Sequence, residues 1–454
     1  MSAHRRNRRA ELFLLLVAAA CVTLSALGSR SNAGSLSNGL SAPLNSESTA
    51  LYCVGFTGNH GVAPANVVFL NSSTQSRTVD IAISSGAGSY SRFSDVVSAH
   101  GSLNLAAARF VGTGFYAVSV QVHGGGVTAV IQGTSHASTS TPCVSQGATR
   151  WLFAGLSTHV PDAATISLLN PTAAAAVVNV SMIATTGIVS PQAFSVVVEP
   201  HAELALALGS QQVNTTNVTA IVRAVSGSVV AAAIESWSGP VAGSSVMPGT
   251  PNESASWIFP DVPTANGVTS VLSLSNLSSS VVVHVTVRVR VDGYVIEPFT
   301  EDVMPQSNTG LIISPSSRIP PAGAALVLVE ASGPLAAGIV ITVPHYGGPW
   351  LSAPSVPSTT QIIDDTKAIG VDAVVVVNQT SSPAIVQMAT YDLSGPHTVK
   401  LIVPARGRQV WSGPQRASWR GHFVVVTSNQ PVSVATTSSV SNLGAVVQNA
   451  SGGR

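Results

Sequence analysis

Ile166-Ser167-Leu168-Leu169-Asn170 is a short apolar run that ends in asparagine, and it is the clearest marker of a pattern that covers most of this 454-residue chain. Runs of this length that are rich in valine, isoleucine and leucine are typical of β-strands. Three similar runs occur, and consecutive asparagines lie about 100 residues apart, which is the size of a whole β domain. The four runs cover residues 67–71, 166–170, 271–276 and 374–378.

Other landmarks recur with the same spacing. The first three units open with an aromatic segment such as 151–155, whereas the fourth has lost its aromatic residues at 368–371. The strictly alternating run 283–291 predicts a strand, and Asp292-Gly293 after it predicts a two-residue hairpin. Each unit has room for about seven short strands, the number found in immunoglobulin-like sandwiches. The prediction is an all-β protein with four tandem immunoglobulin-like β-sandwich repeats, after an N-terminal signal or anchor segment.

Three stretches rich in Ser, Thr, Pro and Gly separate the units and are interpreted as linkers. They cover residues 138–147, 239–254 and 354–366. The predicted N-terminal segment with its polar linker covers 1–50. The first three repeats cover 51–147, 148–250 and 251–358, and the fourth repeat with a short tail covers 359–454.

The recurrent asparagine is interpreted as a structural residue. Asn71, Asn276 and Asn378 each begin an Asn-x-Ser/Thr glycosylation motif, but the equivalent Asn170 precedes Pro171 and cannot accept a glycan. Because asparagine is present even there, we expect the turn itself to require it, through hydrogen bonds between its side chain and nearby backbone groups.

Composition and the N-terminus bear on location. Only 9% of the residues are charged and the net charge is +1, and no basic run occurs outside the first ten residues, so no nucleic-acid partner is expected. Four arginines between residues 5 and 9 precede an apolar stretch, 12–27, which is typical of a signal peptide or a signal anchor. The body of the protein is therefore expected to be exported, either secreted or held at the membrane by this segment alone.

The cysteines agree with export. Cys21 lies in the apolar stretch, and the other two cysteines, Cys53 and Cys143, lie at the two ends of the first unit. A disulfide between them is predicted for an oxidising compartment, and two unpaired buried thiols are the alternative.

Catalytic chemistry has no visible basis in the sequence. The eleven histidines are scattered without metal-binding spacing, and His100 and His201 occupy equivalent turns. His123-Gly124-Gly125-Gly126 is similar to the oxyanion loop of lipases, but no Gly-x-Ser-x-Gly motif accompanies it, so a plain turn is expected. No catalytic residue, metal or cofactor is predicted.

The second unit carries a family resemblance. Trp151-Leu152-Phe153-Ala154-Gly155, Ser167-Leu168-Leu169-Asn170-Pro171 and Val196-Val197-Val198-Glu199-Pro200 resemble the Trp-x-Phe-Ala-Glu-Gly, Leu-x-Asn-Pro and Val-x-Val-Pro-Ala-Gly motifs of an actinobacterial secreted family known only as a domain of unknown function. The likeness extends more weakly over residues 51–440 and lacks the glutamate of the first motif. It implies an exported, envelope-associated β protein and supplies no active-site residues.

Three functions remain open. The expected one is a non-catalytic, envelope-associated scaffold or interaction protein; the alternatives are a cell-wall glycan-binding or glycan-assembly accessory protein and a hydrolase. The expected partner is therefore an envelope protein or a cell-wall glycan. If the glycan hypothesis holds, the predicted binding residues are aromatic side chains for stacking and guanidinium groups for acidic sugars or phosphate. They are Trp411, Trp419, Arg406, Arg408, Arg416 and Arg420.

Overall fold

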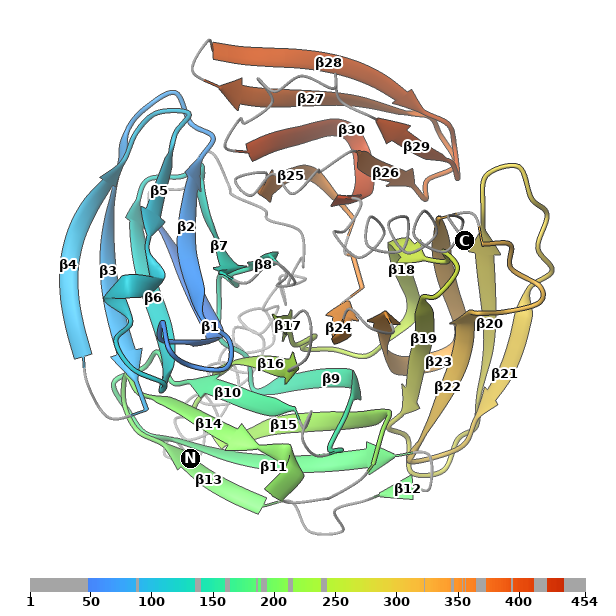
Figure 1. Cartoon of the computed structure of the whole chain (residues 1–454), viewed down its shortest axis with the longest axis horizontal. Helices are drawn as coiled ribbons and strands as arrows, with labels where there is room; N and C mark the ends of the chain where they lie inside the picture. The colour runs from blue at the N-terminus through green and yellow to red at the C-terminus, as the bar shows by residue number, and fades with distance from the viewer. Residues whose placement is uncertain are drawn as a thin grey trace, which may run out of the picture. The chain divides into compact units, whose positions relative to one another are not determined.

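The structure is a computed structural model, and its described part is built of β-strands and two short 3-10 helices, η1 (Ala107–Arg109) and η2 (Leu208–Ser210) (Figure 1). All pairs between named strands are antiparallel. The all-β prediction is thus confirmed. Within this part, no helix has the length and apolar character that crossing a membrane requires. The described residues are 48–86, 90–134, 140–159, 164–184, 187–188, 194–210, 215–237, 243–321, 323–343, 347–352, 354–355, 357–364, 373–392, 395–411 and 423–436.

Strands β1–β8 form group 1, which has two four-stranded sheets with a shared apolar core. Phe56, Phe69 and Phe110 are fully buried in this core, and the rings of Phe56 and Phe110 meet edge to face at 4.9 Å. One sheet has the order β1 (Ser48–Thr57), β6 (Phe115–His123), β3 (Arg77–Ser85) and β4 (Tyr90–Val97); the other has the order β5 (Ser102–Leu105), β2 (Ala65–Asn71), β7 (Val127–Gly133) and β8 (Ser140–Pro142).

Strands β9–β17 form group 2, with the same arrangement of two sheets around one core. Trp151 is fully buried, and its indole N–H donates to the carbonyl of Val229 at 2.7 Å. One sheet contains β9 (Arg150–Leu156), β11 (Ala176–Ala184), β12 (Gly187–Ile188), β13 (Phe194–Val198) and β15 (Val218–Ser226); the other contains β10 (Thr165–Leu169), β14 (Glu203–Ala207), β16 (Val230–Trp237) and β17 (Gly243–Pro248).

Strands β18–β24 form group 3, and strands β25–β30 form group 4. In each group one long strand connects all the others into a single sheet. β23 pairs first with β18 and β20 and further along with β19 and β24, and β30 pairs first with β25 and β27 and further along with β26. Group 3 contains β18 (Ser254–Pro263), β19 (Thr269–Asn276), β20 (Val283–Arg290), β21 (Phe299–Val303), β22 (Ser307–Ser314), β23 (Ala324–Val343) and β24 (Gly347–Ser352); group 4 contains β25 (Ser358–Asp364), β26 (Val374–Asn378), β27 (Ala384–Asp392), β28 (Gly395–Val403), β29 (Arg408–Trp411) and β30 (Phe423–Thr436).

Both long strands contain a proline. The chain remains extended through Gly333-Pro334 in β23 and through Gln430-Pro431 in β30. Proline cannot donate a ladder hydrogen bond, so it usually interrupts a strand. Pro334 lies between the residues of β23 that pair with β20 and those that pair with β19, where the strand changes partners and needs no such bond.

The predicted linkers are also corrected. The stretch 239–254 contains β17, which pairs with β16 and is buried throughout, and 138–147 and 354–366 contain β8 and β25. Small polar residues can be buried when their hydroxyls are hydrogen-bonded. Thr141 donates to the carbonyl of Val246 at 2.8 Å, and Ser245 accepts from the backbone N–H of Leu351 at 2.8 Å. Each of these segments therefore contains a paired strand, of which β17 is buried throughout, whereas the domain bounds themselves stay predictions.

The prediction for the recurrent asparagine is confirmed. Asn71, Asn170, Asn276 and Asn378 are all fully buried. In each case the side-chain amide donates to backbone carbonyls on both sides of the turn, as Asn170 does to Ala174 at 2.7 Å and to Val198 at 2.9 Å. The side-chain oxygen accepts from the backbone N–H two residues later. A buried amide with these partners holds the turn in place and is not a surface acceptor for a glycan.

A second turn completes this motif. His100, His201, Gln306 and Arg406 all have positive φ, between 49° and 55°. Their backbone N–H groups donate to the residue two positions after the asparagine, namely Ser73, Thr172, Ser278 and Thr380. The equivalence of His100 and His201 predicted from the sequence thus has a backbone explanation.

Apolar clusters connect the four groups to one another. Two glycines with positive φ allow neighbouring strand groups to approach closely. A Cβ atom at Gly55 would lie 2.9 Å from Ala232 of group 2, and one at Gly155 would lie 2.7 Å from Val340 of group 3. Groups 1 and 2, 2 and 3, and 3 and 4 share apolar clusters, and so do groups 4 and 1. Group 4 reaches group 1 through Phe423 and through Tyr391, whose ring stacks on His100 at 4.6 Å. The order of contacts is therefore cyclic.

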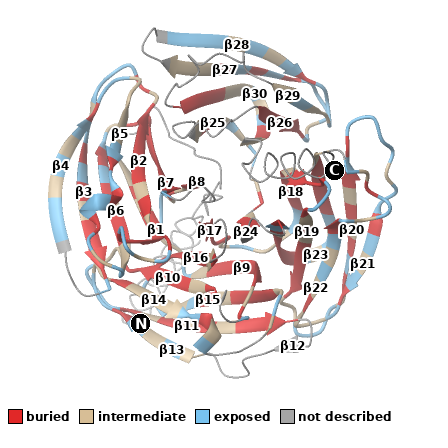
Figure 2. Cartoon of the chain, viewed as in Figure 1, coloured by how far each residue is buried: buried red, intermediate tan, exposed pale blue. Residues whose placement is uncertain are grey.

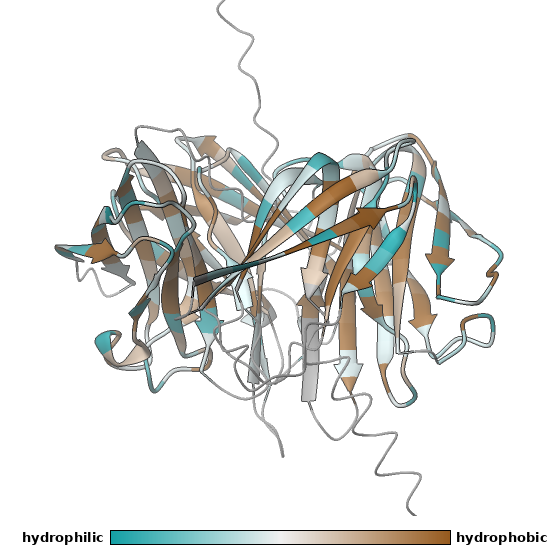
Figure 3. Cartoon of the chain, turned by 90° about the horizontal axis from the view of Figure 1, so that it is seen from above, coloured by the Kyte–Doolittle hydropathy of each residue, from teal (hydrophilic) through white to brown (hydrophobic). Residues whose placement is uncertain are grey.

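Burial and hydropathy follow the strands. Figure 2 shows buried residues along the strands of every group, while β4 and β28 carry many exposed positions. Figure 3 shows hydrophobic residues concentrated along the strands and hydrophilic residues frequent in the connecting loops. This is the distribution expected of sheets that have one face against a core.

Candidate functional site

The predicted disulfide is confirmed. Cys53 on β1 is bonded to Cys143, which follows β8, with a Cα–Cα distance of 4.5 Å and a separation of 90 positions along the chain. Both residues belong to the core of group 1. The bond therefore joins the first and last strands of this group.

Three of the six predicted glycan-binding residues, Arg406, Arg408 and Trp411, lie in the described part. Arg408 on β29 forms ion pairs with Asp292 at 3.0 Å and Asp261 at 3.7 Å, and only 10% of its side chain is exposed. Arg406 is exposed, and its carbonyl accepts a hydrogen bond from Arg290. Trp411 is half-buried and packs against the core of group 4.

The other three, Arg416, Trp419 and Arg420, lie outside the described residues. The structure thus brings Arg408 and Trp411 together on one strand and gives both of them contacts within the protein. A glycan-binding role for the six residues stays a prediction.

The described residues form a pocket of about 640 Å³ on the outer face of the sheet β1-β6-β3-β4. Strand register places its floor. Tyr52, Ser119, Ala82 and Arg92 lie in one row across the four strands, because each is the direct cross-strand partner of the next. Two large side chains at the ends of the row and small ones between them leave a depression.

A second row lies beside the first. Ala50, Gln121, Asp80 and Ser94 are likewise direct partners across the same four strands. All four line the pocket. Since side chains two positions apart on a strand point to the same face, both rows face the same side of the sheet.

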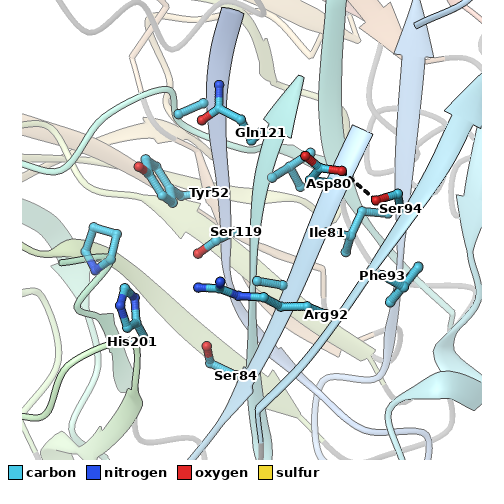
Figure 4. Close-up of a pocket in the computed structure, with 14 residues that line it drawn as sticks. Tyr52, Asp80, Ile81, Ser84, Arg92, Phe93, Ser94, Ser119, Gln121 and His201 are labelled. Carbon is cyan, nitrogen blue, oxygen red and sulfur yellow. Dashed lines mark hydrogen bonds between the residues drawn. The ribbon is translucent and has the colours of Figure 1, made fainter. Parts of the chain in front are cut away.

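Group 2 supplies a further wall. Pro171 and His201, from the paired turns that flank β10 and β14, also line the pocket. Figure 4 shows the Arg92 side chain extending toward the side that His201 lines, with Ser84 and Ser119 near its end. The pocket is thus a junction site between groups 1 and 2.

The charges of the pocket are distinct. Asp80 accepts hydrogen bonds from Ser94 at 2.6 Å and from His123, whose ring nitrogen lies 2.6 Å away (Figure 4 shows the Ser94 bond). The Ser94 hydrogen bond, followed by that of His123, lowers the pKa of Asp80 below its ordinary value. Burial raises the pKa of Tyr52, so its hydroxyl keeps its proton at neutral pH. Asp80 is therefore an anionic acceptor, while Arg92 is a cation.

Glu203 is a second polar group at this junction, two residues beyond His201 on β14. It is only 3% exposed, and its Oε1 accepts from the hydroxyl of Ser167 at 2.7 Å. Its Oε2 has no hydrogen-bond partner among the described residues and faces Gly86 of group 1, which follows the pocket residue Ser84 closely. Burial raises the pKa of Glu203 to about 7, and the Ser167 bond only partly opposes this effect.

Glu203→Gln is expected to remove a pH dependence of stability. The unfolded carboxyl titrates near 4.5 and the folded one near 7. Between these values only the unfolded chain loses its proton, so the free energy of unfolding falls as pH rises, by about 3 kcal/mol in total. Urea unfolding from about pH 4 to pH 8 should therefore show the variant gaining stability over the parent with rising pH. Glu199→Gln, at an exposed position of the same group, is the charge control; parallel curves for parent and Glu203→Gln would contradict the prediction.

Sequence reasoning missed this pocket. Its residues come from four strands and two turns between positions 50 and 201, and none forms a recognisable motif. The sequence signal for the pocket is the alternation of polar residues on the outward face of 77–85 and 90–97. This alternation does not identify which residues of other strands are their neighbours. Among the described residues, no group of three or more His, Cys, Asp or Glu side chains could hold a metal ion.

A family model matches part of the chain. Residues 132–259 match a family of unknown function, DUF5719, which covers group 2 and the strands next to it. The resemblance to a family known only as a domain of unknown function is confirmed for this stretch, while its actinobacterial character and its wider extent stay expectations. The search of curated proteins found no match.

Several solved structures show limited similarity. The Anabaena sensory rhodopsin transducer is 22% identical over 18% of this chain and 98% of its own, with a TM-score of 0.16. Protein 1070 of Thermotoga maritima is 16% identical over 23% of this chain and 94% of its own, with a TM-score of 0.20. A tetra-tandem repeat from the extending region of a large adhesion protein is 14% identical over 86% of this chain and 99% of its own, with a TM-score of 0.12. These TM-scores are too low to carry an argument about fold or function.

Proposed function

We propose that this protein is a non-catalytic, exported protein of the cell envelope, in which four tandem immunoglobulin-like β-sandwich repeats act as a scaffold or interaction platform. The observation that carries the proposal is the cyclic order of apolar contacts between the four strand groups. Tandem domains joined only by linkers move relative to one another unless their interfaces are large and apolar. Here the shared clusters hold the groups together, so their loops are presented in a defined arrangement.

Polar contacts support the same function. Arg408 of group 4 pairs with Asp261 and Asp292 of group 3, and Asn308 of group 3 donates to the carbonyl of Asn217 in group 2 at 2.8 Å. Hydrogen bonds and ion pairs of this kind fix the orientation of packed surfaces more than they increase affinity. The strand groups therefore serve as a framework, and the loops that connect their strands serve as the contact surface for an envelope protein.

Export is supported by two independent features. The arginines and apolar stretch at the N-terminus are typical of a signal peptide or signal anchor. The Cys53–Cys143 disulfide is of the kind that forms and persists in oxidising compartments. Both features support the proposal that the mature protein lies outside the cytoplasm and contacts the membrane only through the N-terminal segment.

A second candidate function is binding of envelope glycans. The junction pocket favours it, because hydroxyl, amide, carboxylate and guanidinium groups gather there around an aromatic ring. Ligand sites often lie at junctions between domains and combine a few placed polar groups with aromatic surface. In this case the protein acts as an accessory that holds a saccharide and does not cleave it.

Cell fractionation tests the proposed location and role. A C-terminally tagged full chain, expressed in its native cells, should appear in the envelope or the medium and should be digested by protease added to intact cells. A variant that lacks residues 12–27 should stay in the cytoplasm, because the apolar stretch directs export. Cross-linking in intact cells should then join the exported protein to an envelope component. Cytoplasmic retention of the full chain would refute the proposal.

A further inference from the structure

We propose that the pocket between groups 1 and 2 binds a short saccharide that carries a uronic-acid carboxylate, with Arg92 bound to the carboxylate and Asp80 bound to sugar hydroxyls. This inference deepens the second candidate function and depends on it. It does not depend on the scaffold role, which the fractionation experiment tests separately.

The shape of the pocket suits a sugar. The volume of about 640 Å³ lies within the roughly 300–1,000 Å³ that is typical of small-molecule sites. Ala82 and Ser119 lie between Tyr52 and Arg92 in one cross-strand row, so the floor is low in the middle and bounded at both ends. The ring of Tyr52 offers an apolar face with a polar hydroxyl, a combination suited to ligands that are partly apolar and partly polar.

The charges match a ligand with two kinds of polar group. Arg92 is on β4 and Asp80 is on β3, offset by one diagonal step, which separates their backbones by about 7–8 Å. Guanidinium groups bind carboxylates through paired hydrogen bonds. A carboxylate such as Asp80 is acceptor-only and therefore suits hydroxyl donors. A uronic acid carries a carboxylate for Arg92 and hydroxyl donors for Asp80 on one sugar ring.

The surrounding residues add hydrogen bonds of both kinds. Ser84, Ser94 and Ser119 can each donate and accept, and Gln121 has an amide that does both. Hydroxyl groups of a saccharide also donate and accept, so they can satisfy such a set without leaving buried groups unpaired.

Two other ligand classes fit less well. Extended peptides commonly bind by adding a strand to the edge of a sheet, whereas this pocket lies over the face of one. A free phosphate would pair with Arg92, but its charge is confined to one small ion close to the carboxylate of Asp80, whereas a uronic acid separates its carboxylate from the ring hydroxyls that can donate to Asp80. The observations therefore favour a sugar acid.

Group 2 completes the site. Pro171 and His201 line the pocket from a different strand group than the other twelve lining residues. His201 is held at a positive φ of 55° by the turn that the buried Asn170 organises, so its position is set by the fold of group 2. The proposed saccharide therefore binds across the two groups.

Isothermal titration calorimetry with the full chain tests the proposal, with trigalacturonic acid as the probe and galactotriose as its neutral counterpart. The acid should bind and the neutral sugar should bind at least about tenfold more weakly, because it lacks the charge-assisted hydrogen bonds. Arg92→Gln should lower the affinity for the acid about tenfold or more for the same reason. Ala82→Leu should abolish binding, since the larger side chain fills the floor.

Arg223→Gln is the matched control, because it removes one exposed arginine from a sheet of group 2 away from the pocket residues. It should change the affinity by less than about twofold. Thermal unfolding of each variant shows whether it is folded. Because Arg92 is exposed, Arg92→Gln is expected to fold, and it tests the proposal even if Ala82→Leu does not fold.

Four outcomes would overturn the proposal. They are no binding of trigalacturonic acid to the parent, equal binding by Arg92→Gln, equal affinity for galactotriose, and equal affinity for inorganic phosphate or for a tripeptide of glutamate. Each of them leaves the result of cell fractionation unaffected, so failure of this site is distinguishable from failure of the scaffold role.

Discussion

Asn170→Ala is expected to lower the free energy of unfolding by about 3–5 kcal/mol, because it leaves several backbone groups without partners. The side-chain amide of Asn170 donates to the carbonyls of Ala174 and Val198, and its oxygen accepts from the backbone N–H of Thr172 at 3.0 Å. The residue is fully buried, so water cannot replace these bonds without opening the turn. Urea unfolding of parent and variant measures the loss.

Two further variants isolate the cause. Asn170→Asp keeps the shape but has no donor, so it should be destabilised at neutral pH at least as strongly as the alanine variant. Asn104→Ala replaces an exposed asparagine on β5 and should cost less than about 0.5 kcal/mol. A small effect of Asn170→Ala, similar to that of Asn104→Ala, would show that the turn does not depend on the asparagine side chain.

Replacement of both Cys53 and Cys143 by alanine is expected to destabilise group 1 by about 4 kcal/mol. The disulfide joins cysteines that are 90 positions apart. The chain-entropy model assigns about 4–5 kcal/mol to a loop of this length, and typical measured values are about 2–4 kcal/mol. The bond also joins β1 to the segment after β8, at the two ends of the group. Chemical unfolding under non-reducing conditions provides the measurement.

Cys21→Ala is the matched control, because it removes the third cysteine and leaves the bridge intact. Its stability should equal that of the parent. Peptide mapping without reductant should recover the linked Cys53 and Cys143 peptides. Two thiols that react with an alkylating reagent in the native protein would contradict the prediction.

Local features of the molecule could be predicted from the sequence. The asparagine turns depend mainly on hydrogen bonds from the side chain to backbone groups a few residues away, such as that from Asn170 to Ala174. Each turn also has one bond to a carbonyl on a neighbouring strand, such as that from Asn170 to Val198. The Asp292-Gly293 hairpin forms as expected, with Val291 paired to Tyr294 and Gly293 at a φ of 81°. The disulfide followed from the number of cysteines and from their positions at the ends of one unit. In each case residue type and position along the chain carry the information.

Features that depend on contacts between groups could not be predicted in this way. Arg408 looked like a surface cation, but its acidic partners Asp261 and Asp292 lie more than 100 positions earlier in the chain. The rows that place Tyr52, Asp80 and Arg92 over one pocket require the register of four strands, and periodicity alone does not specify which strands are neighbours.

The same distinction explains the segments predicted as linkers. Serine, threonine, proline and glycine favour turns locally, so the sequence predicts a linker at 239–254. The structure instead places β17 there, paired with β16 and buried at every residue. Tertiary hydrogen bonds, such as that between Ser245 and the backbone of Leu351, outweigh the weak local preference. Strand positions and turns are therefore encoded by residues near one another in the chain, and the disulfide is indicated by two cysteines at the two ends of one unit. The order of contacts among the four groups, and the pocket between two of them, arise from packing between distant surfaces.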